Sequence, residues 1–380
     1  MRGLIFPTTN LAAVRTVGAK MDSPASAITI NGSVSPSLSG TGMIQFSKSV
    51  SLALPIRRAI TEKIARSSNY YLDATPTHAY LKMLYKYPQA EFPYADLAET
   101  NRSRGKLERK CELIDTGIFD EDRYFDIFVE YARINPAAVN MLVTVWNRGP
   151  DEATLHLLPQ LWFRNTWSWK FEAKRPRISA RNPRSVDVIH HEMGAFQFFV
   201  EKADEWLFTE NETNTSRLFG EDVEGYFKDA FHEYVVNGNA AAINPGRIGT
   251  KAAAYLVRSV SPGGCLQLRA CLRDTSESDP FETFDEVIDA RRTEADAFYN
   301  QLQIDLPNDD ARLVQRQALA GMIWSKQYFY YDVPEWLHGD PSQPPPPLER
   351  IHGRNHEWKH LNNADLVSMP DKWEYPWYAA

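Results

Sequence analysis

The sequence is poor in cysteine, and that shortage limits which class of protein it encodes. Only three cysteines, Cys111, Cys265 and Cys271, occur in 380 residues. The last two are six residues apart in one expected strand, which at ~3.3 Å per residue separates them by about 20 Å, beyond disulfide reach. We therefore expect three free thiols, as in a cytoplasmic protein.

An excess of positive charge is absent as well. The net charge is -7, with lysine and arginine scattered along the chain, so no basic stripe suits a phosphate backbone or an anionic membrane. No apolar run approaches the ~20 residues of a membrane span, and MRGLIFPTTNLAAVRTVGAK lacks the apolar core of a secretory signal. We predict a cytoplasmic protein with neither nucleic acid nor a membrane as partner.

Several catalytic motifs are missing: a glycine-rich phosphate loop, G-x-S-x-G, C-x-x-C and H-E-x-x-H. His190 and His191 are adjacent, and neighbouring strand residues point to opposite faces, so we predict no shared metal. His78 precedes a short helix-like segment, which favours a structural histidine.

Residues 1–66 are predicted to be a leader without a core. SPASAITINGSVSPSLSGTG is rich in Ser, Gly and Thr, and Asp22 and Glu62 are the only acidic residues through Lys63. Such an Arg-containing, acid-poor start is typical of an organelle transit peptide, but we prefer a disordered or wrongly joined leader.

From about Tyr70 the hydrophobic pattern has the period of two that is typical of strands. The alternating segments are RYFDIFVEYA, VNMLVTVW, ATLHLLPQLWF, GAFQFFVE, EWLFT, AAAYLVRSV and CLQLRACLR. Turns such as NRGP at 147–150 and SPGG at 261–264 separate them, so we expect neighbouring antiparallel strands. The prediction is an antiparallel β-sandwich over 67–280.

The period then becomes helical. One helix is expected to pack through Phe284, Ile288, Arg291, Ala295, Phe298 and Leu302. A second, capped by Asp309, is expected to pack through Val314, Ala318, Leu319, Met322 and Ile323. The first helix predicts a linker over 281–308, and the second predicts the start of an all-α domain over 309–380.

After Tyr331 we expect a long irregular segment that ends in NNADLVSMPDKWEYPWYAA. Its candidate ligand groups are Asn362, Asn363, Asp365, Asp371 and Glu374, with the rings of Trp373, Tyr375, Trp377 and Tyr378. Aromatic faces and a rim of carboxylates and amides suit a sugar. The same rings would equally fill a core, and composition alone does not separate the two.

Two further motifs could form the opposite wall of a sugar cleft: LWFRNTWSW at 161–169, and LFTENETNTSRLFG with Glu210 and Glu212. By base rate, a strand end and an acidic turn are the commoner interpretations. Inverting glycoside hydrolysis needs two carboxylates about 6.5–9.5 Å apart. Glu374 with Glu210 or Glu212 is the candidate pair.

Seven stretches together resemble the bacterial-type glucosidases of glycoside hydrolase family 63, relatives of mannosyl-oligosaccharide glucosidase and mannosylglycerate hydrolase. They are YYLDATPTHAYLKMLYKYPQAEFPYADL, LLPQLWFRNTWSW, LFTENETNTSRLFG, DAFHEYVVNG, RRTEADAFY, VQRQALAGMIWSKQYFYYDV and HLNNADLVSMPDKWEYPWYAA. The resemblance covers nearly everything from Asn69 to Ala380. Residues 1–66 do not share it.

The resemblance implies an N-terminal β-sandwich, a linker helix and an (α/α) six-hairpin toroid that begins at 309. It also implies an inverting α-glucosidase for oligosaccharides or small glucosides, without an organic cofactor. The implied substrate-binding residues are Trp373, Glu374, Tyr375, Trp377, Tyr378, Asn362 and Asn363. The general acid and base would lie beyond residue 380, so we expect this chain to be inactive alone. The alternative from another functional class is a non-catalytic carbohydrate-binding or regulatory β-sandwich module.

Overall fold

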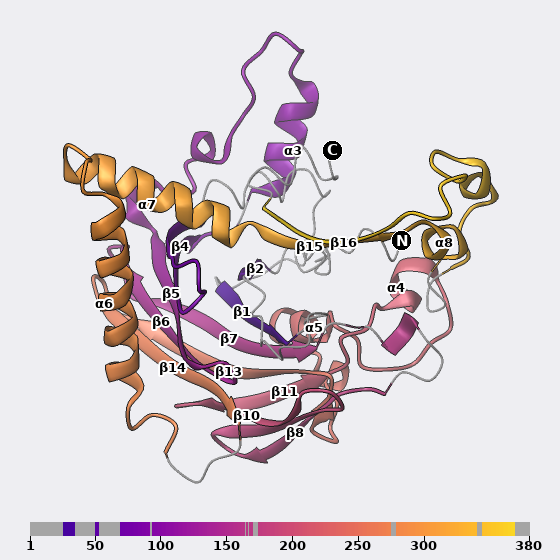
Figure 1. Ribbon diagram of the computed structural model, residues 1–380, viewed down its shortest axis with the longest axis horizontal. Coiled ribbons are helices and arrows are strands. Elements are labelled where there is room, and N and C mark those ends of the chain that lie inside the picture. Colours follow the sequence, from indigo (N-terminus) through magenta and orange to yellow (C-terminus); the bar gives the residue numbers. More distant parts are fainter. Residues whose placement is uncertain are drawn as a thin grey trace.

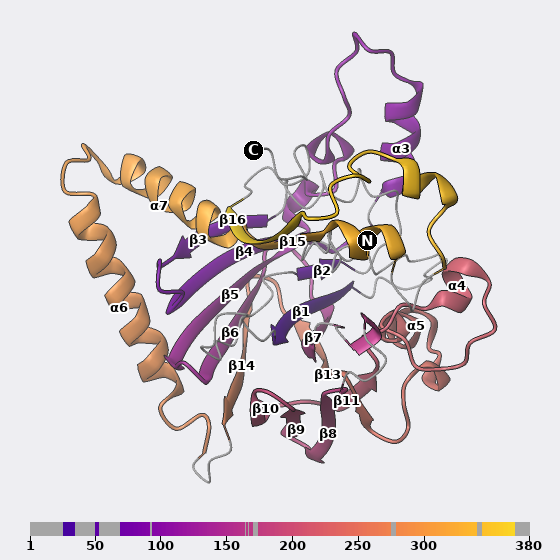
Figure 2. The same ribbon diagram turned by 45° about the vertical axis from the view of Figure 1, so that its right-hand side comes forward.

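The computed structural model describes residues 26–34, 50–52, 69–91, 93–163, 165, 167–169, 174–274, 279–339 and 344–368. In this part of the chain two large sheets pack against each other, and six α-helices surround them (Figures 1 and 2). A β + α fold with a large antiparallel sheet is thus confirmed.

The larger sheet has nine strands, and every neighbouring pair is antiparallel. Their order is β12 (Ile248–Gly249), β8 (Arg177–Asn182), β9 (Ser185–His190), β10 (Gly194–Val200), β14 (Cys265–Asp274), β6 (Ala138–Asn147), β5 (Tyr124–Asn135), β4 (Tyr80–Pro88) and β3 (Asn69–Ala74). The helix-like segment expected after His78 is instead strand β4. Leu81, Met83 and Tyr85 alternate into the core, so a period of two describes it better.

The smaller sheet has the order β11 (Glu205–Thr209), β13 (Lys251–Val260), β7 (Ala153–Phe163), β1 (Ser26–Val34) and β2 (Val50–Leu52). Strands β1 and β2 lie in the segment for which the sequence predicted no structure. Ile28, Thr29 and Ile30 are β-branched strand formers, and β7 offers β1 a parallel partner.

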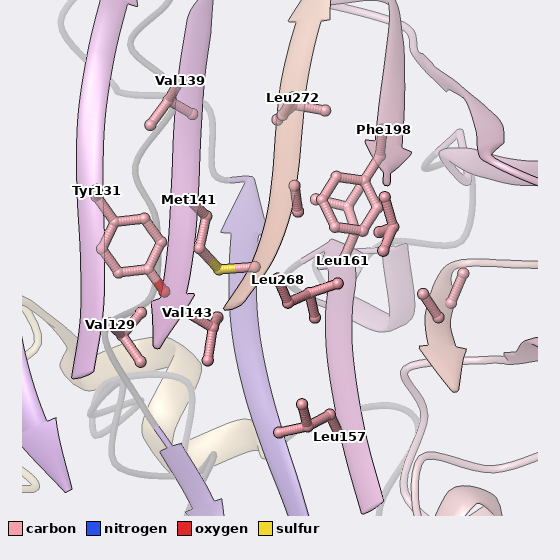
Figure 3. Close-up of a cluster of buried hydrophobic side chains, with 14 of the residues drawn as sticks. Val129, Tyr131, Val139, Met141, Val143, Leu157, Leu161, Phe198, Leu268 and Leu272 are labelled. Carbon is pink, nitrogen blue, oxygen red and sulfur yellow. The ribbon is translucent and has the colours of Figure 1, made fainter. Parts of the chain in front are cut away.

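One hydrophobic core lies between the two sheets. Phe125, Ile127, Val129 and Tyr131 of β5 are all buried there, as their alternation predicted. Figure 3 shows side chains of β5, β6 and β14 facing Leu157 and its neighbours on β7. Burying one such side chain stabilises the fold by about 1.5–3 kcal/mol, so this interior holds the sheets together.

Two tight turns carry the chain from one sheet to the other. NRGP at 147–150 joins β6 to β7, and SPGG at 261–264 joins β13 to β14, so neither turn closes the predicted antiparallel hairpin. Asn147 is fully buried, and its Nδ2 donates to the carbonyls of Asp151 and Val260, both at 2.8 Å. A buried amide with its bonds made fixes the two sheets relative to each other at this end.

The α-helices of the described chain are α3 (Tyr94–Ser103), α4 (Thr215–Phe219), α5 (Ala230–Asn237), α6 (Phe284–Leu302), α7 (Asp309–Trp324) and α8 (Val333–His338). Short 3-10 turns are η2 (Leu113–Thr116), η3 (Asp120–Asp122), η4 (Trp167–Trp169), η5 (Ala240–Ala242) and η6 (Leu348–His352). All three cysteines are free thiols, as predicted.

Helix α6 covers the outer face of the larger sheet over β5 (Figure 1). Phe284 and Ile288 are buried against the sheet, as predicted. Phe298 and Leu302, expected on the same face, are exposed, and Tyr299 is buried in their place. The Tyr299 hydroxyl donates to the carbonyl of Ala74 at 2.7 Å, and this bond sets the rotation of the helix end.

Helix α7 is capped by Asn308 rather than Asp309. The Asn308 side chain accepts a hydrogen bond from the amide of Ala311 at 2.8 Å, which leaves Asp309 as the first helical residue. Ala320 and Trp324 are buried and belong to the sandwich core. The start of an all-α domain at 309 stays a prediction.

The face of α7 that the sequence predicted to be packed is largely open. Val314 and Met322 are exposed, whereas the Trp324 ring stacks on Tyr71 with centroids 5.2 Å apart. The Trp324 indole also donates to the carbonyl of Asp73 at 2.9 Å. Trp324, which was not among the residues predicted to pack, determines which side of α7 faces the sandwich.

The segment expected to be irregular after Tyr331 contains regular structure. Strands β15 (Lys326–Asp332) and β16 (Asn362–Ser368) pair antiparallel, and α8 and η6 lie between them along the chain. We call residues 326–339 and 344–368 the arm. Both views show it running from α7 past the sheets, with its outer end beside α4 (Figures 1 and 2).

Candidate functional site

Most of the predicted sugar-binding residues cannot be placed. Outside the described residues lie Trp373, Glu374, Tyr375, Trp377 and Tyr378, together with Asp371. Asn362 and Asn363 open β16 at the outer end of the arm. The Asn362 amide donates to Asp332 Oδ2 at 3.1 Å, and Asp332 caps α8 through its other oxygen, so Asn362 braces the arm.

The two internal motifs meet in space. The Trp167 indole of η4 donates to Glu212 Oε1 at 2.7 Å, and Arg175 contacts the same oxygen at 2.7 Å. The Asn211 amide donates to the carbonyl of Phe163, the last residue of β7, at 2.8 Å. Segments 45 residues apart in sequence therefore form one junction, which we call the Trp167–Glu212 junction.

Trp167 serves as an anchor in this junction rather than as a stacking surface. Only 6% of Trp167 is exposed, and its ring belongs to the sandwich core. The Glu212 side chain is 26% exposed. Both donors contact Oε1, and the described chain supplies no hydrogen bond to Oε2. Among the described residues, the junction therefore holds a partly exposed carboxylate through Oε1.

Glu210 lies two residues before Glu212, just beyond the end of β11. Buried Thr250 accepts the amide proton of Asn211 at 2.8 Å and donates its own hydroxyl to Glu210 Oε2 at 2.7 Å. Asn211 between them is a bend, and the two carboxylates have different partners: Glu210 contacts Thr250 and Glu212 contacts Trp167. The predicted pairing of either one with Glu374 falls on a residue outside the described chain.

A second layer of charge supports the junction from α4 and α5. Asn214 caps α4, and its Nδ2 donates to Asp229 at 3.2 Å. Arg217 bridges Asp229 at 3.1 Å and Glu233 at 3.2 Å. This network ties α4, which carries the third motif, to the start of α5.

Two lysines, Lys228 and Lys251, lie next to the 210–213 segment. Lys228 Nζ donates to Thr213 Oγ1 at 3.0 Å, and Lys251 Nζ donates to the carbonyl of Lys228 at 3.0 Å. Burial lowers the pKa of Lys228. Burial, together with the neighbouring Lys228 charge, lowers the pKa of Lys251 to about 7. The junction thus contains an amine that exchanges protons near neutral pH.

His190 and His191 do not point to opposite faces. Their rings stack with centroids 4.5 Å apart, because β9 ends at His190 and strand alternation stops there. His190 Nδ1 accepts the amide proton of Glu192 at 3.1 Å, and burial lowers the pKa of His190. Within the described ranges, no three His, Cys, Asp or Glu side chains form a group that could hold a metal ion.

The sequence motifs predicted residues of the junction, but they did not predict the two lysines beside it. Asn211, Glu210 and Glu212 belong to a stretch that the sequence had singled out for a sugar cleft. Lys228 and Lys251 come from outside the motif and carry no local signal, since lysine is an ordinary surface residue. The two lysines reach the junction only because the 226–228 segment packs beside the ends of β11 and β13 in the folded chain.

Comparisons with known proteins give one sequence relative. No protein-family model matches the chain. Uncharacterized protein YMR196W of Saccharomyces cerevisiae is 36% identical over 362 residues, which covers 82% of this chain and 33% of that protein. The chain therefore spans about a third of the length of this relative.

Two of the solved structures that match the chain do so weakly. The polysaccharide lyase BACCELL_00875 has a TM-score of 0.29 and 9% identity, covering 57% of this chain and 24% of its own. A chain described as a kojibiose phosphorylase from human microbiome has a TM-score of 0.22 and 6% identity, covering 55% of this chain and 22% of its own. Neither value carries an argument about fold or function. None of the described helices is both long and apolar enough to span a membrane.

Proposed function

We propose that this chain is the sugar-binding part of an inverting α-glucosidase, and that the Trp167–Glu212 junction contacts the carbohydrate. The observation that carries the proposal is the partly exposed Glu212 carboxylate, which Trp167 and Arg175 hold through Oε1. Trp167 and Glu212 come from two stretches that resemble family 63 glucosidases, and the Trp167 indole donates to Glu212 Oε1. A carboxylate held by two donors keeps its geometry when it binds a hydroxyl.

The proposal extends to segments that the structure leaves undescribed. Trp373, Glu374, Tyr375, Trp377 and Tyr378 would contact the sugar, and residues from 309 onward would begin an (α/α) toroid. The general acid and base would lie beyond residue 380. We expect glucosidase activity from a longer protein and none from residues 1–380 alone, because both catalytic groups are needed for turnover.

The test is a binding titration of the purified chain with α-linked and β-linked glucose disaccharides. We expect saturable binding of the α-linked sugar and a loss of at least about fivefold in affinity in Glu212→Gln, because the ionised acceptor is replaced by a neutral amide. Glu221→Gln is the control, since Glu221 is exposed and lies outside the junction. Equal binding by wild type and Glu212→Gln would contradict the proposed site.

A non-catalytic carbohydrate-binding module is the second candidate. It is favoured by the location of the junction, which is built entirely from β7, β11, β13 and the loops around them and requires nothing from α7. This candidate predicts the same sugar binding, with no glucose release even by a longer protein that contains the chain. Glucose release by that longer protein would support the glucosidase and contradict the non-catalytic module.

A further inference from the structure

Lys251 occupies an unusual place for a lysine. It starts β13 and lies on the outer face of the smaller sheet, the same face on which Ala253 packs beneath α5. Its Nζ lies 4.8 Å from the centroid of the Phe231 ring. The side chain is only partly exposed, with an aromatic ring on one side and the sheet on the other.

Lys228 approaches the same place from the loop before α5. Its backbone amide donates to the carbonyl of Glu212 at 3.1 Å, and its Nζ donates to Thr213. Lys251 in turn donates to the carbonyl of Lys228. The Lys251 Nζ therefore lies beside the Lys228 backbone, and the Lys228 charge is close enough to lower the pKa of Lys251. Lys228 Nζ itself contacts Thr213, the residue after Glu212.

Neither ammonium has an acidic partner in the part of the chain that the structure describes. Among the described residues, no carboxylate oxygen lies within 4.0 Å of either Nζ, and each Nζ donates one hydrogen bond, to a neutral oxygen. Asp229 is close enough to affect both lysines, but its carboxylate is already bound by Arg217 and Asn214. Buried positive charge without a counter-charge is costly, and a bound anion would relieve that cost.

We propose that Lys228 and Lys251 together bind an oxyanion, the carboxylate or phosphate group of an acidic sugar whose hydroxyls reach Glu212. The donors left over on the two lysines suit a compact group with several acceptor oxygens, and a partly exposed position lets a small ligand reach them. The sugar part of this inference rests on the proposed function, whereas the oxyanion part rests on the lysines alone.

The experiment measures binding of inorganic phosphate, glucuronate and glucose by calorimetry at constant ionic strength. We expect phosphate and glucuronate to bind and glucose to bind at least about tenfold more weakly. Lys228→Met and Lys251→Met should each reduce anion affinity by about tenfold or more, and Lys202→Met, at an exposed position, should not.

A second measurement on the wild-type protein does not depend on how the variants fold. Phosphate should slow acetylation of Lys228 and Lys251, followed by peptide mass spectrometry, and leave Lys202 unchanged. Binding of phosphate without glucuronate would keep the oxyanion site and overturn its acidic-sugar ligand. Equal binding of glucose and glucuronate would overturn the oxyanion site and leave the proposed function standing. No anion binding and no protection would overturn the inference entirely.

Discussion

Lys251 shows how the burial of one basic side chain can lower the stability of a fold. Its pKa falls from an ordinary 10.5 to about 7 in the folded protein, chiefly because of burial. The unfolded chain therefore binds a proton between about pH 7 and 10.5 that the folded chain has released, so stability rises with pH across this window. Below about pH 7 Lys251 is protonated in the folded protein as well, so the full destabilisation from burying its charge is present.

Replacement of this residue gives the residue-scale prediction. Lys251→Met should raise the free energy of unfolding by roughly 1–3 kcal/mol at about pH 6, because one pKa unit corresponds to about 1.4 kcal/mol and partial exposure reduces the effect. Urea unfolding at several pH values measures it. The gain should shrink toward about pH 10.5, and a constant difference at every pH would show that packing, not charge, is responsible.

At the scale of elements, α6 is joined to the larger sheet by an ion pair whose carboxylate is buried. Arg292 donates from Nε and Nη2 to Glu130 of β5, both at 2.8 Å, and the Tyr80 hydroxyl donates to the same carboxylate. Burial alone would raise the pKa of Glu130, but the donors outweigh it and lower the pKa. The stability that Glu130 contributes is fully present above pH 4.5, its ordinary pKa. It is lost as the pH falls through the lower pKa of Glu130 in the folded protein.

The prediction at the scale of elements concerns the replacement of Arg292, the cation of this ion pair. Arg292→Met should destabilise the protein by about 1–3 kcal/mol at neutral pH, because buried Glu130 would lose its bidentate partner but keep the Tyr80 hydroxyl, and the exposure of Arg292 reduces the effect. Chemical denaturation measures the change. Arg312→Met, which loses only an exposed pair with Asp309, should cost less than about 1 kcal/mol. Similar losses in both variants would mean that the ion pair with Glu130 does not fasten α6.

At the scale of the whole molecule, the two sheets share one buried core, while α7 has exposed apolar side chains. Leu313 is 52% exposed, Val314 62% and Met322 45% in the described chain. If the proposed toroid is correct, this face is the one that further helices would cover. A solvent-exposed apolar helix face of this kind promotes association.

The whole-molecule prediction therefore concerns self-association. The purified chain should form concentration-dependent oligomers, and Leu313→Lys with Val314→Lys should raise the concentration of half-association by about tenfold or more. Light scattering after size exclusion measures this. Glu349→Lys on the arm is a charge-matched control that should leave association unchanged. A monodisperse wild-type chain would instead favour the carbohydrate-binding module.

How much could be predicted depended on the range of the interactions. The faces of β5 and β6 were predicted because a period of two is a local property. The crossing turns were not, because NRGP and SPGG would also suit hairpins, and only Asn147 and its distant partners show that they join two sheets. The face of α7 was mistaken for the same reason: Tyr71 and Asp73, which hold Trp324, lie about 250 residues away.

The sequence by itself determined seven of the strands, the two long helices, the free thiols and the motifs that contribute to the junction, because alternation and composition act between near neighbours. These strands are β5, β6, β7, β10, β11, β13 and β14. Only the tertiary structure decided that Trp167 is a buried anchor for Glu212, and that Lys228 and Lys251 converge behind it. The burial of a charge depends on everything packed around it, and here those neighbours come from β7, β11, β13 and α5, which the chain brings together only when it folds.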